Sequence, residues 1–415
     1  MLDIRFIRAN PEKVQQNAEA KGYKNLSVVQ LLELDASRRT VQQHVDELRE
    51  RRNANAAKMK GGKPSQELID EGKEIKQQLI QLEDQAAQSA YAFETMLHSF
   101  PNIAEDDVPV GDEEASVEVS RWGEQTVGAR DHLEYALERE WVDFERGAKV
   151  AGAKFYYLKG DLALLEQAIT QYVLNILVAK GFNFMTVPHM VNARTMMGTG
   201  FAPRTSDQSD EYAIEGEDLS LIATAEIPLT GYHADEIIDE ARLPLLYAGL
   251  SPCYRKEAGA SGKHTRGLFR VHQFNKLEMY AYSLPEQSQR VHQQLLAIEE
   301  EIWQAIGVPY HVINIASGDL GAPASKKYDI EYWSPVDSTY RELTSCSNCT
   351  DFQTRNLNIR VRRADGSIEM LHSLNGTAVS LARSLVAVIE HNQRSDGKLD
   401  VPSVLRPYLG NREVL

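Results

Sequence analysis

Residues 28–60 contain neither glycine nor proline, and this uninterrupted stretch constrains the fold more than any other feature of the 415-residue sequence. Leu34, Val41, Val45 and Leu48 recur within it at spacings of seven, four and three residues. That spacing is the heptad pattern of a helix with a single apolar seam. The stretch therefore predicts one long helix that needs a partner along its seam.

The segment MKGGKPSQ breaks this helix with two glycines and a proline. Ile75, Leu79, Leu82 and Ala86 then resume the apolar pattern. Because the turn is short, the two helices must lie side by side, and we expect an antiparallel coiled-coil hairpin within residues 1–100. The first helix would be about 50 Å long at about 1.5 Å per residue.

Basic side chains gather around the turn of the expected hairpin. They are Arg49, Arg51, Arg52, Lys58, Lys60 and Lys63, and Glu50 is the one acid among residues 49–63. A solvated helix face would explain such a cluster if it stood alone. At the end of a projecting arm it suits binding to the phosphate backbone of an extended nucleic acid. Arg38 and Arg52 fall on seam positions, so we expect the seam to be imperfect and to be loosely packed near the turn.

The composition changes after the hairpin. Residues 101–119 are rich in proline, glycine and acidic side chains, which predicts an exposed linker. Beyond it, residues 161–181 trace an apolar helix that we expect Gly181 to end. The strand-like runs adjoin hairpin signals instead of alternating with helices. We expect residues 120–415 to form an α+β domain, with an antiparallel sheet flanked by helices.

Neither export nor membrane insertion is indicated. Charged side chains lie among the first residues, and no apolar run approaches the roughly 18 to 20 residues of a membrane helix. Three cysteines are too few for a disulfide framework, which fits a cytoplasmic protein. Cys346 and Cys349 form one CxxC pair, and ordinary thiols are the simpler interpretation because a structural zinc site needs four ligands.

The stretch YRKEAGASGKHTRGLFRVHQFNKLE at residues 254–278 has six Lys or Arg in a chain of formal net charge −15. It predicts two strands joined by a glycine-rich loop. Alternation along a strand puts Arg255 and Glu257 on one face. It likewise puts Phe274, Lys276 and Glu278 on one face of the return strand. A guanidinium binds phosphate, a carboxylate accepts from an amine and a ring stacks on a base, so this combination suits a nucleotide.

The two ends of this hairpin resemble motif 2 of the class II aminoacyl-tRNA synthetases. LNGTAVSLARSLVAVIEHNQ at residues 374–393 resembles motif 3, and GFNFMTVPHMV, which contains Pro188, resembles motif 1. Between these motifs, MMGTGFAP, TAE and YRELTSCSNCTDFQTR are similar to segments of the seryl-tRNA synthetases of bacterial type. The resemblance extends over nearly the whole chain, including the arm and the RPYLG tail.

The resemblance implies a homodimer that forms seryl-adenylate from L-serine and ATP with Mg²⁺ and then charges tRNA(Ser), while charging of tRNA(Sec) stays open. The implied catalytic residues are Arg255, Glu342 and Arg383. The implied serine site comprises Thr224, Ala225, Glu226, Arg255, Glu278, Asn375 and Thr377. The implied ATP site comprises Arg255, Lys256, Glu257, Val271, Phe274, Glu342, Leu343, Thr344, Ser345 and Arg383, with Glu342 and Ser345 as Mg²⁺ ligands.

Individual roles follow from the same resemblance. Arg255 would hold the α-phosphate and the substrate carboxylate, and Arg383 the γ-phosphate. Glu257 would accept from the adenine amine while Phe274 stacks on the base. Arg383 also stands out on its own, because an otherwise apolar helix that buries an arginine is hard to explain without an anionic ligand.

Two alternatives stay open. One is a relative that activates a small amino acid for a carrier protein or a secondary metabolite, against which the arm argues. The other is a coiled-coil nucleic-acid binder without activity, against which the set of charged motif residues argues. At the positions of His264 and Asn275 the family commonly has acidic residues. The departure at His264 concerns the expected contact with tRNA and not adenylate formation.

Overall fold

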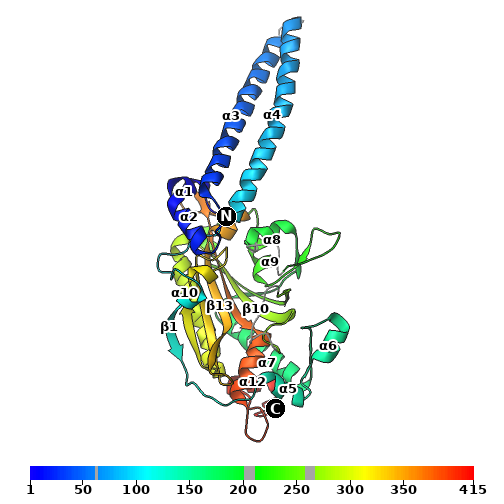
Figure 1. The fold of residues 1–415 in the computed structure, drawn as a ribbon, viewed down its shortest axis with the longest axis vertical. Helices are drawn as coiled ribbons and strands as arrows, with labels where there is room; N and C mark the ends of the chain where they lie inside the picture. The colour runs from blue at the N-terminus through cyan, green and yellow to red at the C-terminus, as the bar shows by residue number, and fades with distance from the viewer. Residues whose placement is uncertain (61–63, 201–210, 258–266) are drawn as a thin grey trace. The chain divides into compact units, whose positions relative to one another are not determined.

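The computed structural model describes residues 1–60, 64–200, 211–257 and 267–415. They form two compact units, Met1–Pro101 and Asn102–Leu415. Figure 1 shows a helical hairpin in the first unit and a sheet with helices in the second.

The first unit contains helices and no strand in its described residues. Its helices are α1 (Ile4–Ala9), α2 (Pro11–Ala20), α3 (Val28–Met59) and α4 (Gln66–Ser99). Helices α3 and α4 lie side by side as the expected hairpin (Figure 1). The hydroxyls of Ser27 and Ser65 each accept a hydrogen bond from a backbone N–H three residues further on, so each long helix begins where a side chain satisfies a free donor.

The seam between α3 and α4 is apolar in its middle and polar toward the turn. Val45 and Leu79 are buried in its apolar part. Arg52, which we expected on the seam, is exposed, and the buried polar residue in this region is Asn55. The Asn55 amide donates to Glu71 Oε2 at 2.8 Å. A buried amide with a partner on the facing helix favours one register of the hairpin.

Arg38, the other arginine that we expected on the seam, contacts the facing helix α4. Its guanidinium carbon lies 4.5 Å from the centre of the Phe93 ring, and its Nη2 lies 3.1 Å from Asp35 Oδ1. Asp35 is only 1% exposed and pairs with Arg8 and Arg39 as well. The charged groups of this part of the hairpin therefore have partners, and α1 is tied to α3 through Asp35.

The second unit is built on an eight-stranded sheet in the order β1-β11-β12-β13-β16-β10-β9-β4, in which only β4 and β9 run parallel. Its strands are β1 (Val117–Trp122), β4 (Asn183–Thr186), β9 (Leu245–Tyr254), β10 (Gln273–Ser283), β11 (Tyr310–Asn314), β12 (Lys326–Ser334), β13 (Thr339–Thr350) and β16 (His372–Ser380). Strands β9 and β10 are the expected long hairpin. Pro188 falls after β4, where no ladder donor is needed.

Short strands and helices surround this sheet. The short strands are β2 (Val142–Asp143), β3 (Tyr157–Leu158), β5 (Met190–Val191), β6 (Tyr212–Ala213), β7 (Ser220–Leu221), β8 (Ile237–Asp239), β14 (Arg360–Arg362) and β15 (Ile368–Met370). The helices are α5 (His132–Glu138), α6 (Phe144–Ala151), α7 (Gly160–Ala179), α8 (Ala193–Thr199), α9 (Glu226–Gly231), α10 (Ser288–Ile306), α11 (Phe352–Asn356) and α12 (Leu381–Asn392). The observed fold is thus the expected α+β arrangement.

Strand β10 shows how the two faces of the sheet differ. Leu277 and Met279 lie in the large core, together with buried residues of α7, α10 and α12. Tyr280 and Tyr282 lie in a second core. Glu278 has the same parity as these tyrosines, so it lies on the face away from the large core. Polar side chains on this face of β10 are therefore free to form a site.

Helix α7 is long and apolar enough to cross a membrane by length and composition alone, with a mean hydropathy of 1.4. Leu165, Ile169, Val173 and Leu177 are nevertheless fully buried in the large core of this unit. Gly181 follows the helix with φ 88°, as expected of a residue that ends a helix. The protein buries the apolar stripe of α7 against its own sheet and helices.

Part of the expected linker is anchored on the second unit. Asn102 is 3% exposed, and its side chain donates to the carbonyl oxygens of Pro323 and Cys349, both at 2.9 Å. The backbone N–H of Ser317 donates to Pro109 O at 2.8 Å. These contacts make the segment after Pro101 part of the second unit instead of an exposed connector along its whole length.

Candidate active site

A pocket lies where β10, β13 and β16 meet the start of α12. Its lining residues are Arg255, Glu257, Phe269, Val271, Phe274, Lys276, Glu342, Leu343, Thr344, Ser345, Thr377, Ser380, Ala382 and Arg383. All the residues expected to bind ATP are among them except Lys256. The Lys256 ammonium instead lies 5.6 Å from the centre of the Tyr212 ring.

Arg255 and Phe274 share the pocket, as the alternation of the hairpin predicted. The backbone N–H of Arg255 donates to His272 O at 3.0 Å, which continues the pairing beyond β9. The guanidinium carbon of Arg255 lies 5.3 Å from the centre of the Phe274 ring. Its Nε donates to Ala223 O at 3.4 Å. The cation is thus held against an aromatic ring, with its other donors available to an anion.

Glu257 lines the same pocket in an unusual backbone conformation. Its φ is 51°, in the left-handed backbone region that residues other than glycine rarely adopt. Its carboxylate lies 2.9 Å from Arg270 Nη1, and its side chain is only 9% exposed. Strain of this kind persists where surrounding contacts hold it, and functional sites are common places for it. Residues 258–266, which include His264, lie outside the described residues.

Arg383 has a partner that the sequence did not reveal. It lies in the first turn of α12, and its Nη1 is 2.8 Å from Glu342 Oε1 on β13. Its guanidinium carbon lies 4.9 Å from the centre of the Phe269 ring. The expectation that no structural partner explains Arg383 is therefore wrong, because β13 brings Glu342 to the helix start. The positive charge of Arg383 holds the pKa of Glu342 well below its usual range.

The expected Mg²⁺ ligands lie on β13. Ser345 pairs in register with Asp329 of β12, so the two side chains lie on the same face of the sheet. Asp329 is 5% exposed, and its Oδ1 has no hydrogen-bond partner among the described residues. Burial raises the pKa of Asp329, and the Lys327 ammonium opposes that rise. Glu342, Ser345 and Asp329 thus offer hard oxygen donors of the kind that Mg²⁺ prefers.

The expected serine residues converge beside the pocket. Glu226, at the start of α9, accepts hydrogen bonds from Gln353 Nε2 at 2.8 Å and from Asn375 Nδ2 at 3.0 Å. Its backbone N–H donates to Thr224 Oγ1 at 3.2 Å, and Ala225 between them is fully buried. Burial, reinforced by the negative charge of Glu278, raises the pKa of Glu226 to about 7.

Glu278 connects this group to the pocket. It pairs in register with Thr377 of β16, and its Oε2 lies 2.5 Å from Lys276 Nζ. Both charged groups are almost fully buried. Glu226 and Glu278 together offer carboxylates to an ammonium group, while Arg255 nearby can pair with a carboxylate. This charge pattern suits a zwitterionic amino acid.

Several residues at this site carried no role in the sequence-based prediction. Lys276 and Phe269 lie in the quoted hairpin, and Gln353 lies in the segment after β13. Lys276 was already predicted to share a face with Glu278, so its alternation was the available signal. No local pattern pointed to Gln353, because its contact with Glu226 joins residues 127 apart in the chain.

Other predicted features lie outside the pocket. Asn275, a departure from the family pattern, donates to Glu166 Oε1 at 3.2 Å and lines a separate cavity with Phe155 and Tyr156. An aspartate there would face Glu166 as a like charge. The three cysteines are buried and free of disulfides.

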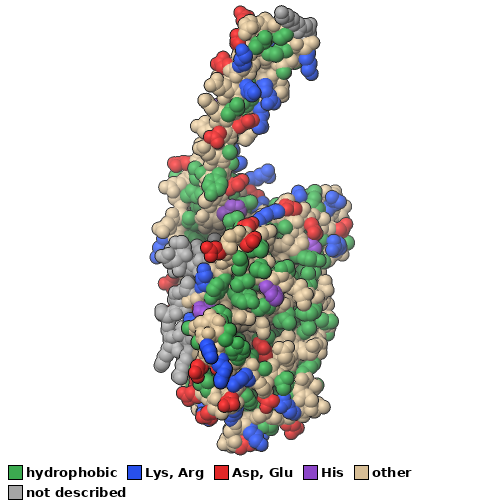
Figure 2. Space-filling model, turned by 90° about the vertical axis from the view of Figure 1, so that its right-hand side faces the viewer, with side chains coloured by type: hydrophobic (Ala, Val, Ile, Leu, Met, Phe, Trp, Pro, Cys, Tyr) green, Lys and Arg blue, Asp and Glu red, His purple; other side chains and the backbone are tan. Residues whose placement is uncertain are grey.

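The basic residues of the arm are exposed on the first unit. Arg49 Nη2 lies 2.9 Å from Glu83 Oε1, and Arg51 Nη2 lies 3.8 Å from Glu71 Oε1. Figure 2 shows Lys and Arg side chains along the hairpin with Asp and Glu side chains between them. Lys63 lies outside the described residues. Part of the basic charge is therefore paired across the hairpin.

Two sequence families match the chain. Residues 1–104 match the seryl-tRNA synthetase N-terminal domain, and residues 210–392 match the tRNA synthetase class II core domain (G, H, P, S and T). The chain is 43% identical to the serine–tRNA ligase of Dictyoglomus thermophilum, over 100% of this chain and 99% of that protein. It is also 43% identical to the serine–tRNA ligase of Methanocella arvoryzae, over 100% of both chains.

Solved structures agree with these matches. The seryl-tRNA synthetase of Pyrococcus horikoshii complexed with ATP aligns with a TM-score of 0.91 and 39% identity, over 100% of this chain and 99% of that one. The cytoplasmic serine–tRNA ligase of Naegleria fowleri in complex with AMP aligns with a TM-score of 0.86 and 30% identity, over 100% and 98%. Because both bacterial and archaeal relatives match, the comparisons do not distinguish a bacterial type.

Proposed function

The chain belongs to the seryl-tRNA synthetase family, and on this basis we propose that it is a serine–tRNA ligase that activates L-serine with ATP and then charges tRNA(Ser). The observation that carries the proposal is the convergence of Arg255 and Arg383 on one pocket, beside the buried carboxylates Glu226 and Glu278. The cations match a triphosphate and a carboxylate. The buried carboxylates match an ammonium group and a hydroxyl group.

In the first step, the carboxylate of serine attacks the α-phosphorus of ATP, the bond from that phosphorus to the bridging oxygen breaks, and pyrophosphate leaves. Arg255 binds the α-phosphate and the serine carboxylate, so it brings both reacting groups together and offsets their charge. Arg383 binds the γ-phosphate. Phe274 stacks on the adenine, and Glu257 accepts from the adenine amine.

Glu342 and Ser345 would hold Mg²⁺, which would neutralise charge on the phosphates and orient them. Val271, Leu343 and Thr344 shape the pocket around the nucleotide. The ion pair between Glu342 and Arg383 would then break. Glu342 would bind Mg²⁺ instead, and Arg383 would bind the γ-phosphate. We propose no role for Lys256 at the nucleotide, since its side chain turns to Tyr212.

The second step transfers serine from the adenylate to a ribose hydroxyl of the 3′-terminal adenosine of the tRNA. That hydroxyl attacks the carbonyl carbon and passes its proton to the leaving phosphate, the bond from this carbon to the phosphate oxygen breaks, and AMP leaves. AMP departs as a stable anion, so orientation and charge stabilisation suffice without a protein nucleophile.

The pocket also selects the amino acid. Glu226 and Asn375 lie where they can bind the serine ammonium and the adjoining backbone of the substrate, next to Thr224 and Ala225. Glu278 and Thr377, which are neighbours across β10 and β16, would form hydrogen bonds with the serine hydroxyl. A site built around a hydroxyl rejects an analogue that lacks it, because its own polar groups then stay unpaired.

We propose that the arm, residues 1–100, binds the body of tRNA(Ser) through its basic residues. From the motifs quoted above we also propose that the chain is a seryl-tRNA synthetase of bacterial type. Residues 120–415 would hold the catalytic machinery. We also propose that the enzyme works in the cytoplasm, away from membranes. Whether tRNA(Sec) is charged as well can be tested with the same assay.

We propose that the chain forms a homodimer through the β4 edge of the large sheet. Strand β4 ends this sheet and pairs on one side only among the described residues. Phe184 on β4 and Leu164 and Val178 on α7 are 37%, 51% and 53% exposed. An exposed strand edge with apolar neighbours is costly in a monomer, and a second copy would cover it.

The test of the proposed function is ATP–pyrophosphate exchange screened across the twenty amino acids, followed by charging of serine tRNA. Serine-dependent exchange together with tRNA charging is expected. Exchange without tRNA charging would favour the carrier-protein alternative. A complete lack of exchange, with tRNA still bound, would favour the inactive nucleic-acid binder.

A further inference from the structure

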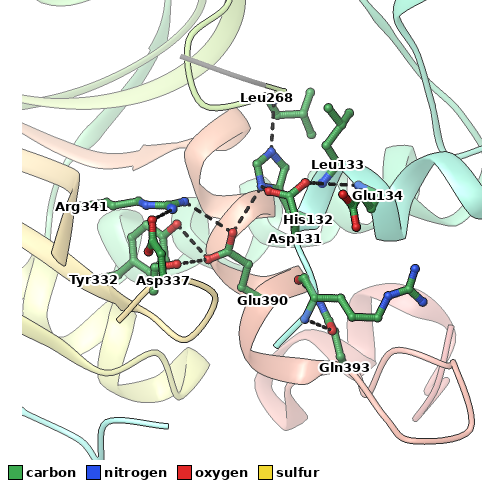
Figure 3. A network of polar contacts seen from close by, with 12 residues as sticks. Asp131, His132, Leu133, Glu134, Leu268, Tyr332, Asp337, Arg341, Glu390 and Gln393 are labelled. Atoms are coloured by element: carbon green, nitrogen blue, oxygen red, sulfur yellow. Dashed lines mark hydrogen bonds and ion pairs between the residues drawn. The ribbon is translucent and has the colours of Figure 1, made fainter. Parts of the chain in front are cut away.

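His132 lies outside the pocket but contacts the segment that leads into it. This first residue of α5 is 2% exposed, and its Nε2 accepts a hydrogen bond from the Leu268 backbone N–H at 3.4 Å (Figure 3). Gly267, with φ 67°, packs so closely on the ring that a Cβ there would lie 2.4 Å from Nε2. The imidazole therefore fixes the backbone directly after residues 258–266.

Glu390 holds the other side of the ring. Because Nε2 accepts, the neutral imidazole carries its proton on Nδ1, which donates to Glu390 Oε1 at 3.2 Å. Glu390 is fully buried and also accepts from the Ser334 hydroxyl at 2.8 Å and the Tyr332 hydroxyl at 3.2 Å. The carboxylate thus selects the one tautomer of His132 that can accept from Leu268.

The same carboxylate reaches the pocket by two routes. Arg341, which precedes Glu342 on β13, has its Nη1 3.6 Å from Glu390 Oε1. Glu390 also follows Arg383 by seven residues on α12, which is two turns along the same side of the helix. Phe269 lies 4.9 Å below the guanidinium of Arg383 and 6.0 Å from that of Arg341. One network therefore joins three segments that build the nucleotide pocket.

This cluster is not well suited to a metal ion. Asp131, His132 and Glu390 do bring ligand atoms within 4.8 Å of one another. However, Glu390 already accepts from two hydroxyls and the imidazole, and the Arg341 guanidinium faces it (Figure 3). A cation at this point would be repelled by Arg341 and would have to displace the hydroxyl donors.

We propose that His132 is a positioning residue for the ATP step of adenylate formation, a role that rests on the proposed function. It holds Gly267 and Leu268, and through them places Phe269 under Arg383, so that the guanidinium is aligned for the triphosphate before ATP arrives. Glu390 keeps the imidazole in the tautomer that this task needs. Since the serine pocket is built from other elements, the effect falls on ATP and not on serine.

Two substitutions separate the two hydrogen bonds of the ring. His132→Asn keeps an N–H donor near the position of Nδ1, toward Glu390, and removes the acceptor for Leu268. His132→Gln keeps an acceptor near the position of Nε2. In pyrophosphate exchange, His132→Asn is expected to raise KM for ATP about tenfold and leave KM for serine within about twofold. His132→Gln is expected to restore KM for ATP to within about threefold of the parent.

A merely structural role would give a different result. If KM for ATP and KM for serine rose together in both variants, or if His132→Asn left KM for ATP unchanged, the proposal would be overturned. The control is His391→Asn, because His391 lies on the same helix as Glu390 and donates to Trp333 O at 2.7 Å without contacting the 267–268 segment. That change should lower Tm while KM for ATP stays within about twofold.

A second measurement does not depend on activity. Hydrogen exchange of the full-length protein without substrates should show faster exchange of the Leu268 amide in His132→Asn than in the parent, and near-parental exchange in His132→Gln. Equal protection of Leu268 in all three proteins would overturn the proposal even if the variants fold. If the parent lacks serine-dependent pyrophosphate exchange, the proposed function fails, whereas the Leu268 comparison still decides whether His132 holds this backbone.

Discussion

The guanidinium of Arg383 lies 2.8 Å from the carboxylate of Glu342, across the junction of α12 and β13. The Arg383 side chain is 14% exposed and the Glu342 side chain 44% exposed, so the pair closes one wall of the pocket while staying reachable from solvent. In the proposed reaction these same two groups bind the γ-phosphate and Mg²⁺. The ion pair thus keeps both charged groups paired, with no net charge between them, until nucleotide and metal arrive together.

Arg383→Ala is expected to lower serine-dependent pyrophosphate exchange by about 10²-fold or more, the scale seen when one group that stabilises transition-state charge is removed. The fold should survive, since Glu342 is exposed enough to be solvated without its partner. Steady-state exchange and a thermal melt check this. Arg394→Ala, which breaks exposed pairs with Asp396 and Asp400, is the control and should leave exchange unchanged. Loss of the folded state in Arg383→Ala would instead identify the pair as structural.

Serine binding is expected to depend on pH through Glu226. Its pKa is raised to about 7 by burial and by Glu278, so the carboxyl is largely neutral below pH 7. The serine ammonium favours the ionised form, hence KM for serine should fall as the pH rises from 6 to 8 and should level off above that. The measurement is KM for serine in pyrophosphate exchange over this range.

The raised pKa of Glu226 also makes the stability of the fold depend on pH, and stability should fall over a range of rising pH in which serine binding improves. A carboxyl with a folded pKa above its unfolded value favours folding while it is protonated, so this contribution is lost as pH rises from about 4.5 toward 7. Glu226→Gln should therefore flatten the dependence of unfolding free energy on pH in that window, and it should also remove the pH dependence of KM for serine. A variant that kept the parental pH profile of KM would show that another group titrates.

Glu278→Gln is expected to lower kcat/KM for serine by about 30-fold, equivalent to about 2 kcal/mol for loss of a charged hydrogen bond. The parent should activate alanine far less than threonine, because alanine leaves the hydroxyl-binding groups unpaired and threonine only adds a methyl group. Exchange kinetics with all three amino acids check this. A parent that preferred alanine would contradict the hydroxyl-binding role.

The matched control for this change addresses Lys276, which Glu278→Gln leaves as a buried charge without its partner. The double variant Lys276→Met with Glu278→Gln removes both charges and should recover much of any loss in Tm. Serine activation should stay low in the double variant. Recovery of activity there would show that the unpaired lysine, and not the missing carboxylate, caused the defect.

The basic residues of the arm are expected to set the salt dependence of tRNA binding. Replacing Arg49, Arg51, Arg52 and Lys58 by alanine should reduce the slope of log K against log salt by about 1 for each phosphate that the arm no longer binds. Adenylate formation should be unaffected. Equilibrium binding at several salt concentrations checks this, and an unchanged slope would count against phosphate binding by these side chains.

A substitution that removes an ion pair across the hairpin should have the opposite effect on tRNA binding. Glu83→Gln removes the Arg49 ion pair at 2.9 Å and leaves only the longer pair with Asp46 at 3.8 Å, so it should strengthen tRNA binding and steepen the salt slope. Glu74→Gln is the control, because Glu74 also lies on α4 but its carboxylate accepts a hydrogen bond from the neutral amide of Gln78 at 3.2 Å. Equal effects of the two substitutions would indicate a general change in net charge.

Local pattern was enough to predict several parts of this molecule. The heptad spacing predicted α3 and α4, the alternation along β9 and β10 placed Arg255 and Phe274 in one pocket, and the position of Gly181 marked the end of α7. Each of these rests on neighbours a few residues apart, because helix and strand periodicities act over that range. The order of the motifs further indicated the family.

The amino-acid sequence by itself thus determined the periodic elements and the chemical types present at the site. Only the tertiary structure decided which of these groups are partners: Arg383 with Glu342, Glu226 with Gln353, and His132 with Glu390. The reason is physical, since each pair joins distant elements and forms only when the order of β12, β13, β16 and β10 in the sheet and the packing of α5, α9 and α12 bring them together. Charge and burial then set the state of each group, as the raised pKa of Glu226 and the single tautomer of His132 show.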